Sequence, residues 1–100
     1  MAWRIESFED TPNPDALKCW LDRPISDGPV SFRRPEEARD PAPGTDPALV
    51  DLAVRLFDRA GLTSVLFLGQ WMTVNKAREA RWRDVKRTVR AVLAGAGDGP

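Results

Sequence analysis

The 100-residue chain contains no histidine, no tyrosine and a single cysteine, Cys19. Histidine is the side chain that most readily exchanges a proton near neutral pH, so its absence removes the commonest general acid or base. Serine, threonine and cysteine have no imidazole to activate them as nucleophiles. A metal site built on imidazoles or several thiolates is excluded within one chain. We therefore expect a protein that is not an enzyme and has no resident cofactor.

The sequence also lacks targeting and membrane signals. Residues 1–10, MAWRIESFED, contain no basic segment followed by an apolar one, and no apolar run approaches the length of a membrane span. A lone cysteine cannot form an internal disulfide, which fits a reducing compartment. These observations predict a soluble, cytoplasmic protein without a membrane partner.

The formal net charge is zero, but the charges are unevenly placed. Residues 1–50 hold ten acids and six bases, whereas residues 71–100 hold seven bases and three acids. Without a net positive charge, long-range attraction to nucleic acid is weak, which disfavours nucleic acid as a partner. A local basic face could still meet an acidic protein surface.

In three short segments, side chains that are mainly apolar alternate with ones that are mainly polar, which is typical of strands. The first covers residues 3–8, with positions 3, 5 and 7 on one face and positions 4, 6 and 8 on the other. The second covers residues 16–21 and turns Cys19 toward the core and Trp20 away from it. The third runs only from Val30 to Phe32, after a turn at residues 27–29, and two arginines follow it. Its brevity and these charges favour an edge strand.

The segment Thr11-Pro12-Asn13-Pro14 separates the first two strands. Two prolines fix φ and remove two backbone donors, which predicts a rigid turn. Asn13 suits an Asx turn, in which its side chain accepts a hydrogen bond from nearby backbone.

Residues 47–60 carry apolar side chains at helical spacing. Thr45 or Asp46 precedes them as a candidate N-cap, with Pro47 at the first helical position, and Gly61 is placed to end the helix in the left-handed conformation. A second amphipathic helix follows from Trp82 to residue 93. The intervening residues 35–46 are rich in proline and charge, which indicates a surface connection with one helical turn at residues 36–39.

Residues 61–76 form the most apolar stretch; its first run contains a single Ser64, and Gly69-Gln70 then interrupts it. The pattern predicts a hairpin closed by a two-residue turn with glycine first. Trp71 and Thr73 would face away from the helices. The side chains expected to face the helices are Val65, Phe67, Met72 and Val74. The order strand, strand, strand, helix, strand, strand, helix predicts an α+β two-layer sandwich, with a mainly antiparallel sheet and both helices on one face. Residues 1–94 would form one domain and residues 95–100 a flexible tail.

Two surfaces are candidates for partner binding. One is the basic face of the last helix, formed by Arg83, Lys86, Arg87 and Arg90. It is either a solvated face or a contact for an acidic protein surface, with a phosphate backbone less favoured because no aromatic platform is interleaved with the bases. The other is the sheet face that displays Trp20 and Trp71, unless a loop or the 35–46 connection covers them.

Cys19 has two interpretations. It is either a small buried apolar residue or an exposed thiol that ligates iron or a cluster across a dimer. The sequence does not indicate an oligomeric state.

Several segments resemble the N-terminal domain of the Nfu/NifU-like iron–sulfur cluster scaffold proteins. The resemblance covers about residues 1–94, and its segments occur in family order and spacing. They are Thr11-Pro12-Asn13-Pro14, Leu17-Lys18, Arg34–Ala38, Pro47–Leu49, Leu56-Phe57, Gly61–Val65, Trp71–Lys76 and Trp82.

The resemblance implies the fold derived above and an association with iron–sulfur cluster assembly, with assembly factors or client apoproteins as protein partners. Family members typically continue into a second domain whose Cys-x-x-Cys binds the cluster. This chain holds only Cys19, so cluster ligation does not carry over. The role that transfers to residues 11–14 and to the hairpin is structural. The connection at residues 40–45 is longer than usual in the family, and Gly69-Gln70 replaces a turn that commonly carries an acid, which bears on partner specificity.

Overall fold

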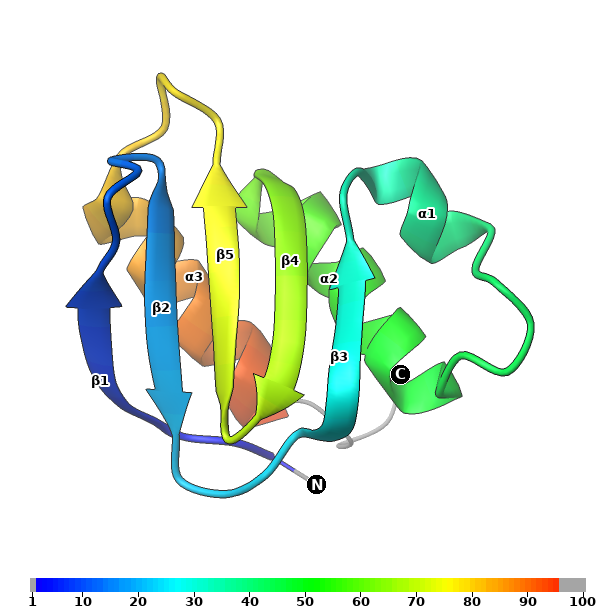
Figure 1. Cartoon of the computed structure of the whole chain (residues 1–100). Helices are drawn as coiled ribbons and strands as arrows, with labels where there is room; N and C mark the ends of the chain where they lie inside the picture. The colour runs from blue at the N-terminus through cyan, green and yellow to red at the C-terminus, as the bar shows by residue number, and fades with distance from the viewer. Residues whose placement is uncertain (1, 96–100) are drawn as a thin grey trace.

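In the computed structural model, which describes residues 2–95, five strands form one antiparallel sheet (Figure 1). Their order across the sheet is β1-β2-β5-β4-β3. The strands are β1 (Ile5–Asp10), β2 (Ala16–Leu21), β3 (Ser26–Phe32), β4 (Leu62–Gly69) and β5 (Trp71–Lys76). The helices are α1 (Pro35–Arg39), α2 (Pro47–Ala60) and α3 (Trp82–Gly95). The predicted α+β class and order of elements are confirmed, as is the edge position of β3.

The two long helices, α2 and α3, cover the same face of the sheet (Figure 1). The β4–β5 hairpin supplies the centre of the core beneath them. Phe67 lies opposite Met72 and Val65 lies opposite Val74, and each of these side chains is at most 2% exposed. The prediction for this hairpin face is therefore confirmed, and because side chains alternate along a strand, the residues between them point to the uncovered face.

Local signals for turns and caps have the predicted effect. Gly69 has a φ of 60°, and it begins the two-residue turn that joins β4 to β5. Asp46 caps α2 by accepting a hydrogen bond of 2.9 Å from the Ala48 amide. Gly61 ends α2 with a φ of 63°, in the left-handed region that glycine tolerates best.

The predicted faces of the first strand were wrong beyond Ile5. Ile5 lies opposite Leu21, but Ser7 lies opposite Trp20, so one extra residue of β1 forms a bulge. An extra residue reverses the alternation that follows it. Phe8, rather than Ser7, therefore shares the helix side with Ile5 and packs against the core.

The turn predicted at residues 27–29 was also wrong. These residues lie inside β3, which begins at Ser26 and is longer than the Val30–Phe32 strand expected from the sequence. Ser26 lies opposite Gly69 and Val30 lies opposite Phe67, so the residues between them bulge out of the ladder. An edge strand accommodates a proline such as Pro29 because its outward side needs no backbone donor.

The remaining predictions concern the connection and the C-terminus. α1 occupies the place where one helical turn was expected in the 35–46 connection. α3 includes Gly95, the first residue of the predicted tail, and residues 96–100 lie outside the described residues. No helix among residues 2–95 is both long and apolar enough to cross a membrane.

The two glycines at positions 61 and 28 allow a matched test of backbone strain. Gly61→Ala should lower the free energy of unfolding by about 1 kcal/mol, because the left-handed conformation places Cβ too close to the backbone. Gly28→Ala, at a residue without positive φ and with open space around its Cα, should change it by less than about 0.5 kcal/mol. Urea unfolding of both variants measures the difference, and equal effects would contradict the assignment of strain to Gly61.

Candidate partner-binding surfaces

Trp20 and Trp71 lie side by side on the sheet face opposite α2 and α3 (Figure 1). They are direct cross-strand partners in β2 and β5, and both are half-buried. The Lys18 ammonium lies 4.2 Å from the ring centroid of Trp20 and 4.3 Å from that of Trp71. Because one cation contacts both aromatic rings, the three side chains form a joined surface feature.

Neighbouring strands extend this feature. The Trp20 indole donates a hydrogen bond of 3.2 Å to a carboxylate oxygen of Glu9, which lies opposite Lys18 in the β1–β2 ladder. On the other side, Leu66 and Leu68 of β4 alternate with buried residues, point to the same face and are half-buried. The set is called the outer tryptophan patch: Glu9, Lys18, Trp20, Leu66, Leu68 and Trp71.

The alternative that the 35–46 connection covers the tryptophans is wrong. That connection lies beyond β3, with α1 against α2 and β3, and β3 is two strands away from β5 (Figure 1). Sequence reasoning found the tryptophans but missed Lys18 and Glu9. The same period-two alternation that turned Trp20 outward also turns Lys18 outward, whereas the pairing of β1 with β2 that brings Glu9 alongside is a tertiary fact.

The four predicted residues of the basic face of α3 line one surface, and Arg83 and Arg87 are exposed there. Lys86 and Arg90 have a structural contact: the Lys86 ammonium lies 5.0 Å and the Arg90 guanidinium 4.8 Å from the ring centroid of Phe8. These cations therefore lie over the contact between α3 and β1. The six residues predicted to bind partners fall on two separate surfaces, because the tryptophans face away from the helix layer that contains α3.

Cys19 does not fit the interpretation as an exposed ligand. It is fully buried on the helix side of β2 and lies opposite Met72. Burial raises the pKa of its thiol from 9.0 to about 12, although the nearby positive charges of Lys86 and Arg90 act in the opposite direction. A cysteine ligates a metal or cluster as the thiolate, and a site shared between two chains would need that sulfur at the surface. Among residues 2–95, no three histidine, cysteine or acidic side chains are grouped so that they could hold a metal ion.

The segment Thr11-Pro12-Asn13-Pro14 lies at the opposite end of the sheet from the β4–β5 turn, where it joins β1 to β2. The Asx turn predicted for Asn13 is present: its side-chain oxygen accepts a hydrogen bond of 2.9 Å from the Asp15 amide. The Thr11 hydroxyl lies 2.9 Å from the carbonyl oxygen of Asn13 and 3.1 Å from that of Ala16. Side chains within the turn thus satisfy its own backbone groups.

This turn also forms hydrogen bonds with the last residue of β5 and the first residue of α3. The Trp82 indole donates a hydrogen bond of 2.9 Å to the carbonyl of Pro14, across 68 residues of sequence. Lys76, only 8% exposed, donates to the Asp15 carboxylate at 2.9 Å and to the carbonyls of Ala77 and Arg78. Three of the family-like segments therefore meet in one set of contacts, here called the turn cluster: Thr11, Asn13, Pro14, Asp15, Lys76 and Trp82.

Burial of Cys19 predicts a pH dependence of stability. The unfolded thiol loses its proton near pH 9.0, while the folded thiol keeps it until about pH 12, so the folded state binds more protons between these values and stability falls as pH rises. Between pH 9 and 10 the free energy of unfolding should drop by about 1 kcal/mol more for the native protein than for Cys19→Ala. Urea unfolding at the two pH values measures this. Parallel pH profiles, or rapid thiol labelling of the folded protein, would contradict the burial of Cys19.

The turn cluster predicts a second effect on stability. Asp15→Ala should lower the free energy of unfolding by about 2 kcal/mol, because the buried Lys76 ammonium loses its ion-pair partner. Adding Lys76→Met should restore much of this loss. The control is Asp51→Ala, which removes the ion pair of an exposed carboxylate with the half-buried Arg55 and should cost less than about 0.5 kcal/mol. Equal costs for Asp15→Ala and the control in urea unfolding would argue against this role of the ion pair.

Comparisons with known proteins agree with this architecture. The chain matches the protein SAV1430 from Staphylococcus aureus with a TM-score of 0.66 and 21% identity, over 89% of this chain and 96% of that one. It matches a NifU-like protein from Saccharomyces cerevisiae with a TM-score of 0.66 and 22% identity, over 93% and 76% of the two chains. The protein SeR13 from Staphylococcus epidermidis gives a TM-score of 0.58 and 18% identity, over 94% and 99%. At these identities the likeness shows a shared fold.

A comparison with curated proteins finds no match. The family model described as "Scaffold protein Nfu/NifU N terminal" matches residues 5–97, which is nearly the whole chain. This family is a scaffold or accessory domain linked to iron–sulfur cluster scaffolding, and it is not known as a catalytic one. The chain therefore belongs to the Nfu/NifU N-terminal domain family.

Proposed function

We propose that this domain is a non-enzymatic interaction module in iron–sulfur cluster assembly, and that its protein partner docks on the outer tryptophan patch. The partner would be an assembly factor or a client apoprotein. Family membership supports the assignment to cluster assembly. The observation that carries the proposed surface is the pairing of Trp20 with Trp71 around Lys18 on the sheet face opposite α2 and α3.

The physical argument concerns what these side chains do in the absence of a partner. Two adjacent indoles and two leucines remain half-buried, although positions on a solvated sheet face are usually polar. Tryptophan is enriched among the residues that dominate binding energy at interfaces, especially where neighbouring groups exclude water. Glu9 and Lys18 hold the Trp20 ring from two sides, so the ring is ordered before a partner arrives.

The patch is better suited to binding a protein than the basic face of α3. Lys86 and Arg90 are already placed over Phe8, and they stabilise the joint between α3 and β1. A cargo role through Cys19 is not supported, because the thiol is buried and holds its proton. The contribution of the described residues to cluster assembly would therefore be recognition, not ligation.

The test is in-cell crosslinking followed by identification of the captured proteins. The native domain should capture iron–sulfur assembly factors or client apoproteins. The Trp20→Thr/Trp71→Thr variant, which keeps residues suited to strands, should reduce this capture about tenfold or more. The matched control is Arg83→Ala/Arg87→Ala on α3, which should capture the same proteins as the native domain.

Two outcomes would contradict the proposal. Capture of no assembly factor or client, together with normal activity of cluster-dependent enzymes in a strain that lacks the domain, would remove the proposed function. Unchanged capture by the tryptophan variant with loss in the arginine variant would move the docking surface to α3.

A further inference from the structure

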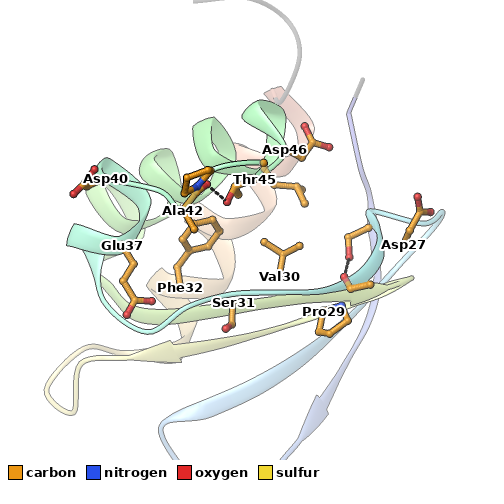
Figure 2. A pocket seen from close by; sticks show the side chains of 15 residues that line it. Asp27, Pro29, Val30, Ser31, Phe32, Glu37, Asp40, Ala42, Thr45 and Asp46 are labelled. Carbon is orange, nitrogen blue, oxygen red and sulfur yellow. Dashed lines mark hydrogen bonds between the residues drawn. The ribbon is translucent and has the colours of Figure 1, made fainter.

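A groove lies along the outer edge of the sheet, between β3 and residues 40–46 (Figure 2). Its volume is about 730 Å³, within the size range of typical ligand pockets. The side chains of Val30 and Phe32 rise from β3 toward the connection on the far side (Figure 2). The lining also includes Leu49 of α2. We call this feature the β3 groove.

The wall opposite β3 has a defined shape. The Thr45 hydroxyl donates a hydrogen bond of 2.7 Å to the carbonyl of Ala42, and the Thr45 amide donates to the same oxygen at 3.2 Å. Asp46 caps the first turn of α2 directly after this closed segment. Hydrogen bonds within the connection and the Asp46 cap hold residues 42–46 in place, and the groove lies between these residues and β3.

The inner wall is an unpaired strand edge. β3 is the last strand of the sheet on this side, and its ladder is formed with β4 alone. Within the described part of the chain, the backbone of residues 27–32 makes no backbone hydrogen bond outside that ladder. The Ser26 hydroxyl donates to the Gly28 carbonyl. An edge strand with unpaired N–H and C=O groups is a template for one more strand.

The charges of the groove have one sign. Four carboxylates belong to its lining, and no lysine or arginine does; they are Asp27, Glu37, Asp40 and Asp46. In Figure 2 the carboxylates of Asp27, Asp40 and Asp46 stand around the rim, while the middle is apolar.

The nearby arginines do not neutralise the whole rim. The Arg39 guanidinium forms an ion pair of 2.6 Å with the carboxylate of Asp58, which is not part of the groove lining. The Arg34 guanidinium lies 3.8 Å from the carboxylate of Glu37. Among residues 2–95, Asp27 and Asp40 form no ion pair. The rim therefore keeps a negative potential that an approaching cation would meet.

We propose that the β3 groove binds an extended, basic segment of a partner protein, which pairs with β3 as a sixth strand of the sheet. Backbone hydrogen bonds along the free edge would supply affinity. Because side chains alternate along a strand, the lysine or arginine side chains would all lie on the groove side, where their apolar stems pack over Val30 and their charged ends reach the carboxylates at the rim. This site is independent of the outer tryptophan patch, because it uses an edge of the sheet and the patch uses a face, so both can be occupied together.

The probe is a blocked peptide of 7 residues, the length of β3, in which lysine and valine alternate. Titration into the isotope-labelled domain, followed by amide NMR shifts, should perturb residues 26–32 and 40–46 and leave Trp20 and Trp71 unchanged. Alternate N-methylation of the peptide backbone along one edge removes the donors that pair with β3 and should abolish binding. A peptide with glutamate in place of lysine should not bind.

The matched protein variants separate charge from fold. Asp27→Asn/Asp40→Asn should weaken binding of the lysine peptide about three- to tenfold, and added salt should reduce the difference. Glu6→Gln, which removes an exposed carboxylate from the strand at the opposite edge, should leave binding unchanged.

No binding at millimolar peptide, equal binding of the N-methylated peptide, or shifts confined to other surfaces would overturn the proposal. Equal binding of the glutamate peptide would overturn its charge specificity. None of these results bears on the capture of assembly factors through the tryptophan patch, so the two proposals fail separately.

Discussion

The packing of two helices on one face of the β4–β5 hairpin is the constraint on which the rest of this domain depends. Phe67 and Met72 are fully buried there, and their strands hold the centre of the sheet. Burial of such side chains is the main favourable term in folding a chain of this size. Since alternate residues point to opposite faces, covering one face with helices leaves the other in water. The outer tryptophan patch is not covered by α2 or α3, because both helices pack on the other face of the sheet (Figure 1).

The same constraint separates the charges of the chain in space. The sheet ends in β1 on one side and β3 on the other. The cations of α3 contact Phe8 on β1, whereas the carboxylates of the groove surround β3. The basic face of α3 and the acidic groove thus lie at opposite sides of the sheet, although β1 itself also carries the carboxylates Glu6, Glu9 and Asp10. Such a distribution orients approaching partners even when net attraction is absent.

Local chemistry predicted the elements best. Asp46 before Pro47 marked the start of α2, and Gly61 marked its end, because caps depend on one or two residues. The bulges in β1 and β3 were missed, since an extra residue is tolerated or not according to the partner strand. The outward positions of Trp20 and Lys18 follow from the alternation of side chains along β2. The contact of Lys18 with both rings also depends on the pairing of β2 with β5, which the sequence alone does not show.

What the sequence by itself determined is the alternation and spacing of apolar residues, the turns and caps, and the absence of histidine. These depend on neighbours in the chain or on composition, so they are legible without coordinates. Only the tertiary structure decided that Trp82 bonds to Pro14, that Lys76 is buried against Asp15, and that residues 40–46 stand opposite β3 to form a groove. Each of these contacts joins segments whose meeting depends on how the whole sheet is assembled, and no local pattern encodes that assembly.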